Sequence, residues 1–263
     1  MNRIKNHGVV MDMRELDYLA GTLPYKVNNP SGDWTPYIPL GENQYSNMTD
    51  SMACVSFSFL NVLETTIKFL TGQEVDFSDR FLAKVSNTTI HGNTLGIVAD
   101  AFRKYGCPLE ADYPKPISFT WDEFYTDIPT EVFNKVLRYD IGYEWIETTV
   151  ESLQYHLKQA PLQLVIPGHA ICGIYEQSDI FKYFDTYAPY LKDHANPPMY
   201  ALKIVLNIKE NKMTETEVKN LYALAFYRLP DQSELDFWKG KQLSEFLKTA
   251  ISDRAKFLEE QNG

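Results

Sequence analysis

The sequence has few cysteines, few basic residues and no long hydrophobic run. Its three cysteines can form at most one disulfide and leave one thiol free, which excludes a disulfide-rich framework and is typical of a reducing compartment. The longest apolar runs, such as residues 162–167, have the length of a strand, so we expect no membrane span. The 25 Lys and Arg residues are outnumbered by 35 Asp and Glu residues, and the net charge of −10 argues against a nucleic-acid partner.

Several sequence motifs are missing as well. We find no Gly-rich phosphate loop, no Cys-x-x-Cys or paired-His metal spacing and no Gly-x-Ser-x-Gly elbow, so we expect no cofactor and no metal. No apolar segment follows the basic residues of the first seven positions, so no secretory signal is visible, and we expect a soluble protein that is cytoplasmic at synthesis. Hydrophobic residues are abundant, at 44%, which predicts a packed globular protein.

Hydrophobic periodicity predicts helices first and strands later in the chain. Turn formers dominate residues 1–53, and from there apolar residues recur every three or four positions up to Leu70, with Gly72 as a C-terminal cap. A buried helix is therefore predicted to begin at Cys54. We interpret the charged residues Asp76, Asp79 and Arg80 that follow it as a solvated face. Further helices are predicted at 94–105, 121–125, 130–138 and 149–157, and β-rich runs lie at 162–167, 170–175, 180–187 and 200–208.

This order predicts an α+β domain with two lobes, a helical lobe followed by an antiparallel β lobe. After polar residues 209–212, helices are predicted to open at 214–217 and 231–234, and a third covers 243–251. We therefore divide the chain into an N-terminal arm (1–32), the α+β domain (33–210) and a small all-helical C-terminal module (211–263).

Cys54 is the first candidate for a chemical role. It stands where the long helix begins, and the positive end of a helix dipole favours the thiolate, which is the nucleophilic form. A thiol nucleophile needs a base, and the base needs a third group to orient it. Of the five histidines, His169 begins a β-run, and Asp185 follows 16 residues later at the end of the next strand. Each residue alone is more often a core residue, but the three together favour a Cys-His-Asp triad.

These motifs, in this order, resemble the papain-like cysteine peptidases. That family has a nucleophilic Cys at the start of its central helix, a His followed by Ala-Val or a close equivalent, and an Asn or Asp about sixteen residues further on. Here the matching motifs are Cys54-Val-Ser-Phe-Ser, His169-Ala-Ile and Asp185-Thr-Tyr, and the resemblance covers roughly residues 33–208. It implies a two-lobed papain-like fold.

The resemblance also implies further site residues. Gln44 matches the family's oxyanion-hole glutamine, and Gly92 and Asn93 match the segment that binds extended substrate. Nine residues separate Gln44 from Cys54, which is more than the family's usual five. Asp185 replaces the commoner Asn, and Tyr187 replaces a Trp that shields the His–Asn bond. With the family's disulfides mostly absent, these departures resemble a bacterial or phage branch.

The implied function is hydrolysis of peptide bonds through a thioester, with a peptide or protein as the substrate. Two alternatives remain open: hydrolysis or transpeptidation of peptidoglycan cross-links by the same triad, and a virion or surface scaffold that retains a peptidase fold. The C-terminal module is similar to a small helical repeat of unknown function found on bacterial surface and phage proteins, which implies tethering to a protein partner and association with a virion. A plain amphipathic helical tail explains the same pattern equally well.

Overall fold

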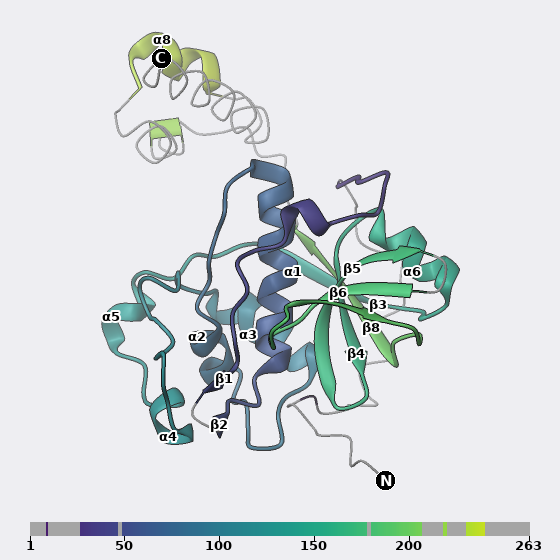
Figure 1. The fold of residues 1–263 in the computed structure, drawn as a ribbon. Helices are drawn as coiled ribbons and strands as arrows, with labels where there is room; N and C mark the ends of the chain where they lie inside the picture. The colour runs from purple at the N-terminus through teal and green to yellow at the C-terminus, as the bar shows by residue number, and fades with distance from the viewer. Residues whose placement is uncertain are drawn as a thin grey trace, which may run out of the picture. The chain divides into compact units, whose positions relative to one another are not determined.

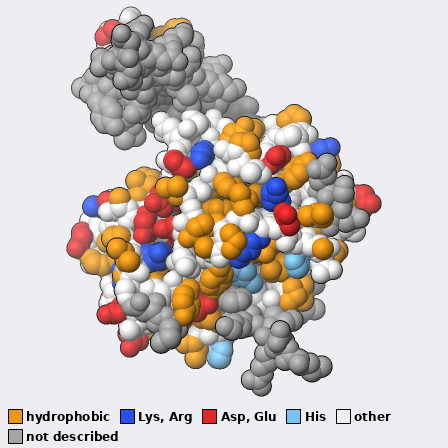
Figure 2. Space-filling model, viewed as in Figure 1, with side chains coloured by type: hydrophobic (Ala, Val, Ile, Leu, Met, Phe, Trp, Pro, Cys, Tyr) orange, Lys and Arg blue, Asp and Glu red, His pale blue; other side chains and the backbone are white. Residues whose placement is uncertain are grey.

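The computed structural model describes residues 9, 27–46, 49–177, 180–206, 218–219 and 230–239. The chain divides into two compact units, Met1–Asn207 and Ile208–Gly263, which we describe separately. On the face of the molecule shown in Figure 2, apolar side chains are interspersed with side chains of both charges. Among the described helices, none has the length and apolar character that crossing a membrane requires.

The first half of the larger unit is a helical lobe built around one long helix. Helix α1 (Cys54–Thr71) ends at Gly72, whose positive φ of 71° allows its N–H to bond with the Lys68 carbonyl at 2.8 Å. In Figure 1 the sheet lies on one side of α1 and the other α-helices of this half lie on the opposite side. The other elements of this half are η2 (Thr35–Tyr37), β1 (Tyr45–Ser46), β2 (Thr49–Asp50), α2 (Asp79–Val85), α3 (Leu95–Tyr105), α4 (Trp121–Phe124) and α5 (Thr130–Phe133).

The second half is a six-stranded sheet in the order β3-β8-β4-β5-β6-β7, and every neighbouring pair is antiparallel. Helix α6 (Val150–Leu157) connects β3 to β4. The strands are β3 (Ile141–Ile146), β4 (Leu162–Ile166), β5 (His169–Gln177), β6 (Ile180–Phe184), β7 (Leu191–His194) and β8 (Tyr200–Leu206).

One continuous apolar core joins the two lobes. It contains Phe59 and Leu60 from α1 together with Ile171 from β5 and Leu202 from β8, all of them buried. Trp34 is also fully buried, and its indole N–H donates to the Leu157 carbonyl at 2.6 Å. The residues ahead of the helical lobe are therefore attached to the end of α6 in the β lobe.

The predicted α+β architecture with a helical lobe and an antiparallel β lobe is confirmed, and so are the helices at α1, α3 and α6. Thr94 and Thr149 cap the N-termini of α3 and α6, and their side chains accept from backbone N–H groups three residues ahead. The helix predicted over 130–138 ends at Phe133 instead, because Leu137 leaves it to form a β-bridge with Cys107. The elements that were not predicted are η2, α2, β1, β2, β3 and β7.

The predicted solvated face after α1 is wrong for Asp79 and Arg80, whereas Asp76 is exposed. Arg80 and Asp79 belong to α2 and are buried. The Arg80 guanidinium donates to the carbonyls of Phe124 (2.7 Å), Glu123 (2.5 Å) and Pro114 (3.3 Å). A guanidinium can be buried here because backbone carbonyls replace the water that would otherwise bind its N–H groups.

In the smaller unit, the helix predicted at 231 is confirmed. Helix α8 (Gln232–Trp238) begins with a capping box between Asp231 and Glu234, and it buries Leu235 and Trp238. The helices predicted at 214 and over 243–251 lie outside the described residues.

Candidate active site

Cys54 is the first residue of α1, and its position depends on the residues just before it. Met52 has a positive φ of 55°, and its N–H donates to Asp50 Oδ1 at 2.8 Å. This turn directs the chain into the helix, so that the Ala53 carbonyl accepts from the Ser56 and Phe57 N–H groups. Cys54 is fully buried at 0% exposure, and the Ala170 N–H of β5 donates to its sulfur at 3.4 Å.

The environment of Cys54 favours the neutral thiol in this structure. Burial raises the pKa of Cys54 far above its usual value, the Ala170 N–H partly opposes this, and the nearby carboxylates of Asp50 and Asp185 raise the pKa further. The thiolate expected from the helix N-terminus is therefore not the favoured form here, because removal from water outweighs the helix dipole.

His169 and Asp185 form a direct hydrogen bond, as their spacing predicts. His169 Nε2 lies 2.6 Å from Asp185 Oδ1, and both side chains are buried. The Thr186 N–H also donates to Oδ1 at 2.6 Å. Burial alone would raise the pKa of Asp185, but the hydrogen bonds and charges of His169 and Lys192 outweigh burial and lower it. Asp185 is therefore a carboxylate at neutral pH.

The strand order explains why these residues meet. Strands β5, β6 and β7 are neighbours, with Cys172 opposite Phe184 and Phe184 opposite Leu191. The start of β5 and the residues just after β6 therefore lie at one end of the sheet, which is where α1 begins (Figure 1). The structure thus brings Cys54, His169 and Asp185 together.

Gln44 lies beside the same turn, and hydrogen bonds hold both ends of its carboxamide. Its Nε2 donates to Asp50 Oδ1 at 2.8 Å, and its Oε1 accepts from the Thr186 hydroxyl at 2.7 Å. The side chain is fully buried. The extra residues between Gln44 and Cys54 form the short hairpin β1–β2, which returns the chain to the start of α1. The role of Gln44 in an oxyanion hole stays a prediction.

Asp50 and Lys192 are site residues that sequence reasoning missed. Asp50 accepts from Gln44, from the Met52 N–H and from the Tyr187 hydroxyl at 2.5 Å. The Tyr187 ring packs against the His169 ring with centroids 5.4 Å apart, in agreement with the aromatic cover that the resemblance implies. The sequence signal that could have identified Asp50 as a site residue is its position four residues before Cys54.

Gly92 and Asn93 form a turn whose contacts are mostly internal. The Asn93 amide donates to the Ser86 carbonyl at 2.9 Å and to the Ser86 and Thr88 hydroxyls, and its Oδ1 accepts from the Thr94 N–H at 2.8 Å. The backbone of Asn93 forms a parallel β-bridge with Val9, which is buried. Substrate binding at Gly92 and Asn93 stays a prediction.

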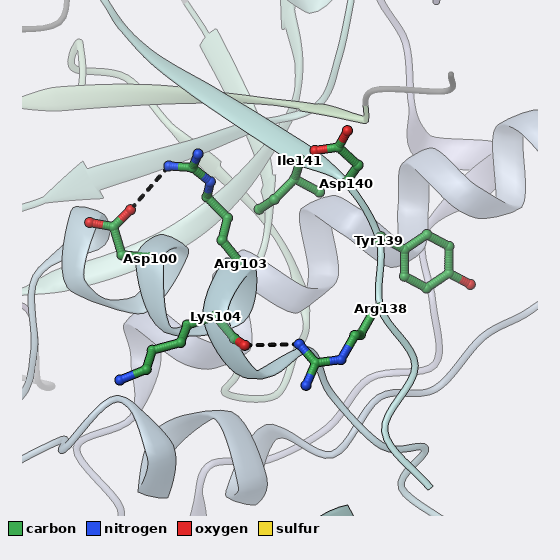
Figure 3. Close-up of a pocket in the computed structure, with 7 residues that line it drawn as sticks. All are labelled: Asp100, Arg103, Lys104, Arg138, Tyr139, Asp140 and Ile141. Carbon is green, nitrogen blue, oxygen red and sulfur yellow. Dashed lines mark hydrogen bonds and ion pairs between the residues drawn. The ribbon is translucent and has the colours of Figure 1, made fainter. Parts of the chain in front are cut away.

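A surface pocket at the end of α3 has a different character (Figure 3). Its lining comes from α3 and from the segment that leads into β3, and it contains three basic side chains. Arg103 pairs with Asp100 at 3.4 Å, and Arg138 donates to the Lys104 carbonyl at 2.9 Å. These contacts neutralise the negative end of the helix dipole, which accounts for the basic residues without a ligand.

Solved structures with a similar fold include several cysteine proteases. Neither a protein-family model nor a curated protein matches the sequence. Similar solved structures include the proform of the ragweed pollen allergen Amb a 11, a cysteine protease, with a TM-score of 0.54 and 17% identity over 75% of this chain and 70% of that chain. Digestive procathepsin L 3 of Tenebrio molitor has a TM-score of 0.54 and 14% identity over 76% of each chain.

A third similar structure is the Carica candamarcensis cysteine protease CMS1MS2 in complex with E-64, with a TM-score of 0.50 and 15% identity over 66% of this chain and 97% of that chain. The larger unit therefore has the papain-like two-lobed fold. At these identities the likeness establishes the fold, and the chemistry rests on the residues described above.

Proposed function

We propose that this chain is a papain-like cysteine peptidase that hydrolyses peptide bonds through a thioester acyl-enzyme. The observation that carries the proposal is a set of hydrogen bonds at the end of the sheet where β5 begins. The Ala170 N–H donates to the Cys54 sulfur at 3.4 Å, and the adjacent His169 is bonded to Asp185 at 2.6 Å. The likeness to cysteine proteases in fold supports the same function.

In the proposed reaction, His169 transfers the protons. Because Nε2 is bonded to Asp185, Nδ1 is the ring nitrogen assigned to take the proton of the Cys54 thiol. The sulfur then attacks the scissile carbonyl carbon, and the imidazolium protonates the leaving amine as the C–N bond breaks. Water, deprotonated by His169, hydrolyses the resulting thioester and restores the thiol.

The oxyanion of the tetrahedral intermediate needs donors beside the sulfur. The backbone N–H of Cys54 and the side chain of Gln44 are the proposed donors. Gln44 Nε2, which donates to Asp50 in the described structure, is the side-chain donor assigned to the oxyanion. Loss of one such donor typically lowers turnover by about 10²–10³-fold.

The proposed catalytic form differs from the described one in access to Cys54. A sulfur at 0% exposure is out of reach of a polypeptide, so substrate binding must uncover it. Transfer of the Cys54 proton to His169 also gives the thiolate a cationic partner, which opposes the effect of burial on the pKa of Cys54.

The test combines activity with covalent labelling. Cys54→Ala and His169→Ala should each lower kcat/KM on peptide substrates by at least about 10⁴-fold, and combining them should cost little more. Asp185→Asn should retain substantial activity, since an amide oxygen still accepts from His169. An epoxide inhibitor of cysteine peptidases should add to Cys54 once per chain, as intact-mass analysis would show. Cys172→Ala, which removes a buried thiol of β5, is the matched control and should remain active.

Near-native turnover in folded His169→Ala would contradict the proposal. The same proteins assayed on purified peptidoglycan separate the cell-wall alternative, because cross-link cleavage without peptide hydrolysis would assign the triad to that substrate. If the parent protein has neither activity, the scaffold alternative is supported. The bacterial or phage origin and the tethering role of residues 211–263 belong to the proposal as predictions.

A further inference from the structure

Lys192 places a positive charge against the candidate triad. It lies on β7, opposite Tyr183 of β6, and its side chain is 26% exposed. Its Nζ donates to Asp185 Oδ2 at 2.6 Å, while Oδ1 of the same carboxylate bonds with His169 at 2.6 Å. One carboxylate therefore joins an imidazole to an ammonium group.

Asp185 and Lys192 have opposite electrostatic effects on the His169 imidazole. A carboxylate next to an imidazole stabilises the imidazolium, and an ammonium group on the other side of that carboxylate offsets its charge. The Asp185–Lys192 pair carries no net charge, as a neutral amide would, yet it keeps a strong acceptor 2.6 Å from Nε2.

On the basis of the proposed function, we propose that Lys192 is a positioning residue of the peptidase site. It holds Asp185 in the orientation that His169 needs, and its ammonium group offsets the carboxylate charge next to His169. His169 can then both release and accept a proton during each turnover.

The other titratable groups around His169 do not offset the charge of Asp185. Cys54 faces it from α1, and Asp50 reaches it from β2 through Tyr187. Both of these are anionic when ionised, so they add to the effect of Asp185. Tyr183 on β6 stays a neutral phenol, because burial and then the charge of Asp185 raise its pKa. Among the residues that the structure describes, the cation in contact with Asp185 is Lys192.

Removing each charge of the pair in a double-mutant cycle tests the proposal. Lys192→Met leaves Asp185 uncompensated and should move the pH midpoint of the His169 titration, followed by NMR of its ring, upward by about one pH unit. Asp185→Asn leaves Lys192 uncompensated and should move the midpoint downward by a similar amount. The double variant is neutral again and should return close to the parent. The pH profile of kcat/KM should move in the same directions.

Two controls separate this effect from general charge or stability effects. Lys192→Arg keeps the charge and should leave the midpoint unchanged. Lys182→Met removes a lysine from β6, opposite Asp193, and should also leave it unchanged. An unmoved midpoint in folded Lys192→Met would overturn the proposal, as would an equal shift in Lys182→Met.

If Lys192→Met does not fold, the comparison of Asp185→Asn with the double variant decides instead, and identical midpoints there would overturn the proposal. The NMR titration needs no substrate. A protein without peptidase activity but with the predicted shifts would therefore refute the proposed function and retain the role of Lys192.

Discussion

A group of carboxylates between α1, α2 and the loop before α4 makes the stability of the protein depend on pH. Figure 2 shows acidic side chains gathered on one side of the molecule, over the connection between α1 and α2 in Figure 1. Glu110 is the clearest member, because burial, followed by the charges of Glu42 and Asp76, raises its pKa to about 7. Burial also raises the pKa values of Asp76 (to about 6), Glu64 and Asp79.

The raised pKa of Glu110 determines the direction in which stability changes with pH. Glu110 keeps its proton to higher pH in the folded chain than in the unfolded chain, where its pKa is close to 4.5. Its contribution to stability is therefore fully present below pH 4.5 and is lost as the pH rises to about 7. A rise from 4.5 to about 7 corresponds to at most about 3 kcal/mol.

Glu110→Gln tests this reasoning, because an amide resembles the protonated acid at every pH. Glu110 Oε1 accepts from the Lys115 N–H at 2.5 Å, a bond that the amide oxygen can keep. Oε2 is buried without a hydrogen-bond partner, so its negative charge is poorly compensated. The variant should equal the parent at pH 4.5 and exceed it by up to about 3 kcal/mol at pH 7.5.

The assay is urea denaturation of both proteins at several pH values between 4.5 and 7.5, with exposed Glu147→Gln as the control. Taking the difference between variant and parent cancels groups of opposite sign, such as His156, whose pKa burial lowers to about 4. A Glu110→Gln variant that is no more stable than the parent at pH 7.5 would refute the reasoning.

Three further predictions concern the core, the thiols and the N-terminal arm. Arg80→Ala should lower the free energy of unfolding by about 3 kcal/mol in urea denaturation, since three carbonyls lose a charged donor, and an unchanged midpoint would contradict this. All three thiols are buried, but the proposed function requires only Cys54 to become accessible, so limiting iodoacetamide should give one adduct, on Cys54, by intact-mass analysis. Preferential labelling of Cys107 or Cys172 would contradict this. Deleting residues 1–25 removes Val9, which pairs with Asn93, and should raise the rate on a small peptide without changing its pH dependence; a folded but no faster truncation would remove this idea.

Elements with strong local signals could be predicted from the sequence. Helix α1 has apolar residues at helical spacing and Gly72 at its end, and α3 and α6 have Thr caps, so short-range patterns determine their bounds. His169 and Asp185 could be predicted as partners because β5 and β6 are consecutive antiparallel strands that relate them within 16 residues.

Elements stabilised by distant partners could not be predicted in this way. In β3, Glu144 interrupts the apolar pattern, and only its buried ion pair with Lys203 of β8 explains why it lies in a sheet. Helix α2 has a charged sequence, and Arg80 is buried there because carbonyls more than thirty positions away accept its N–H groups. Such partners have no signature near the residue itself.

Strand β7 shows why Lys192 in particular was missed. Its sequence, Leu-Lys-Asp-His, alternates weakly between exposed and partly buried positions, as charged edge strands commonly do. Register decides which residue faces Asp185, and a slip of one position would turn Lys192 to the opposite face of the sheet. Such a slip would bring a neighbour of Lys192, Leu191 or Asp193, to that face instead. A second carboxylate there would oppose ionisation of Asp185, whereas the observed register supplies the ammonium group that lowers the pKa of Asp185.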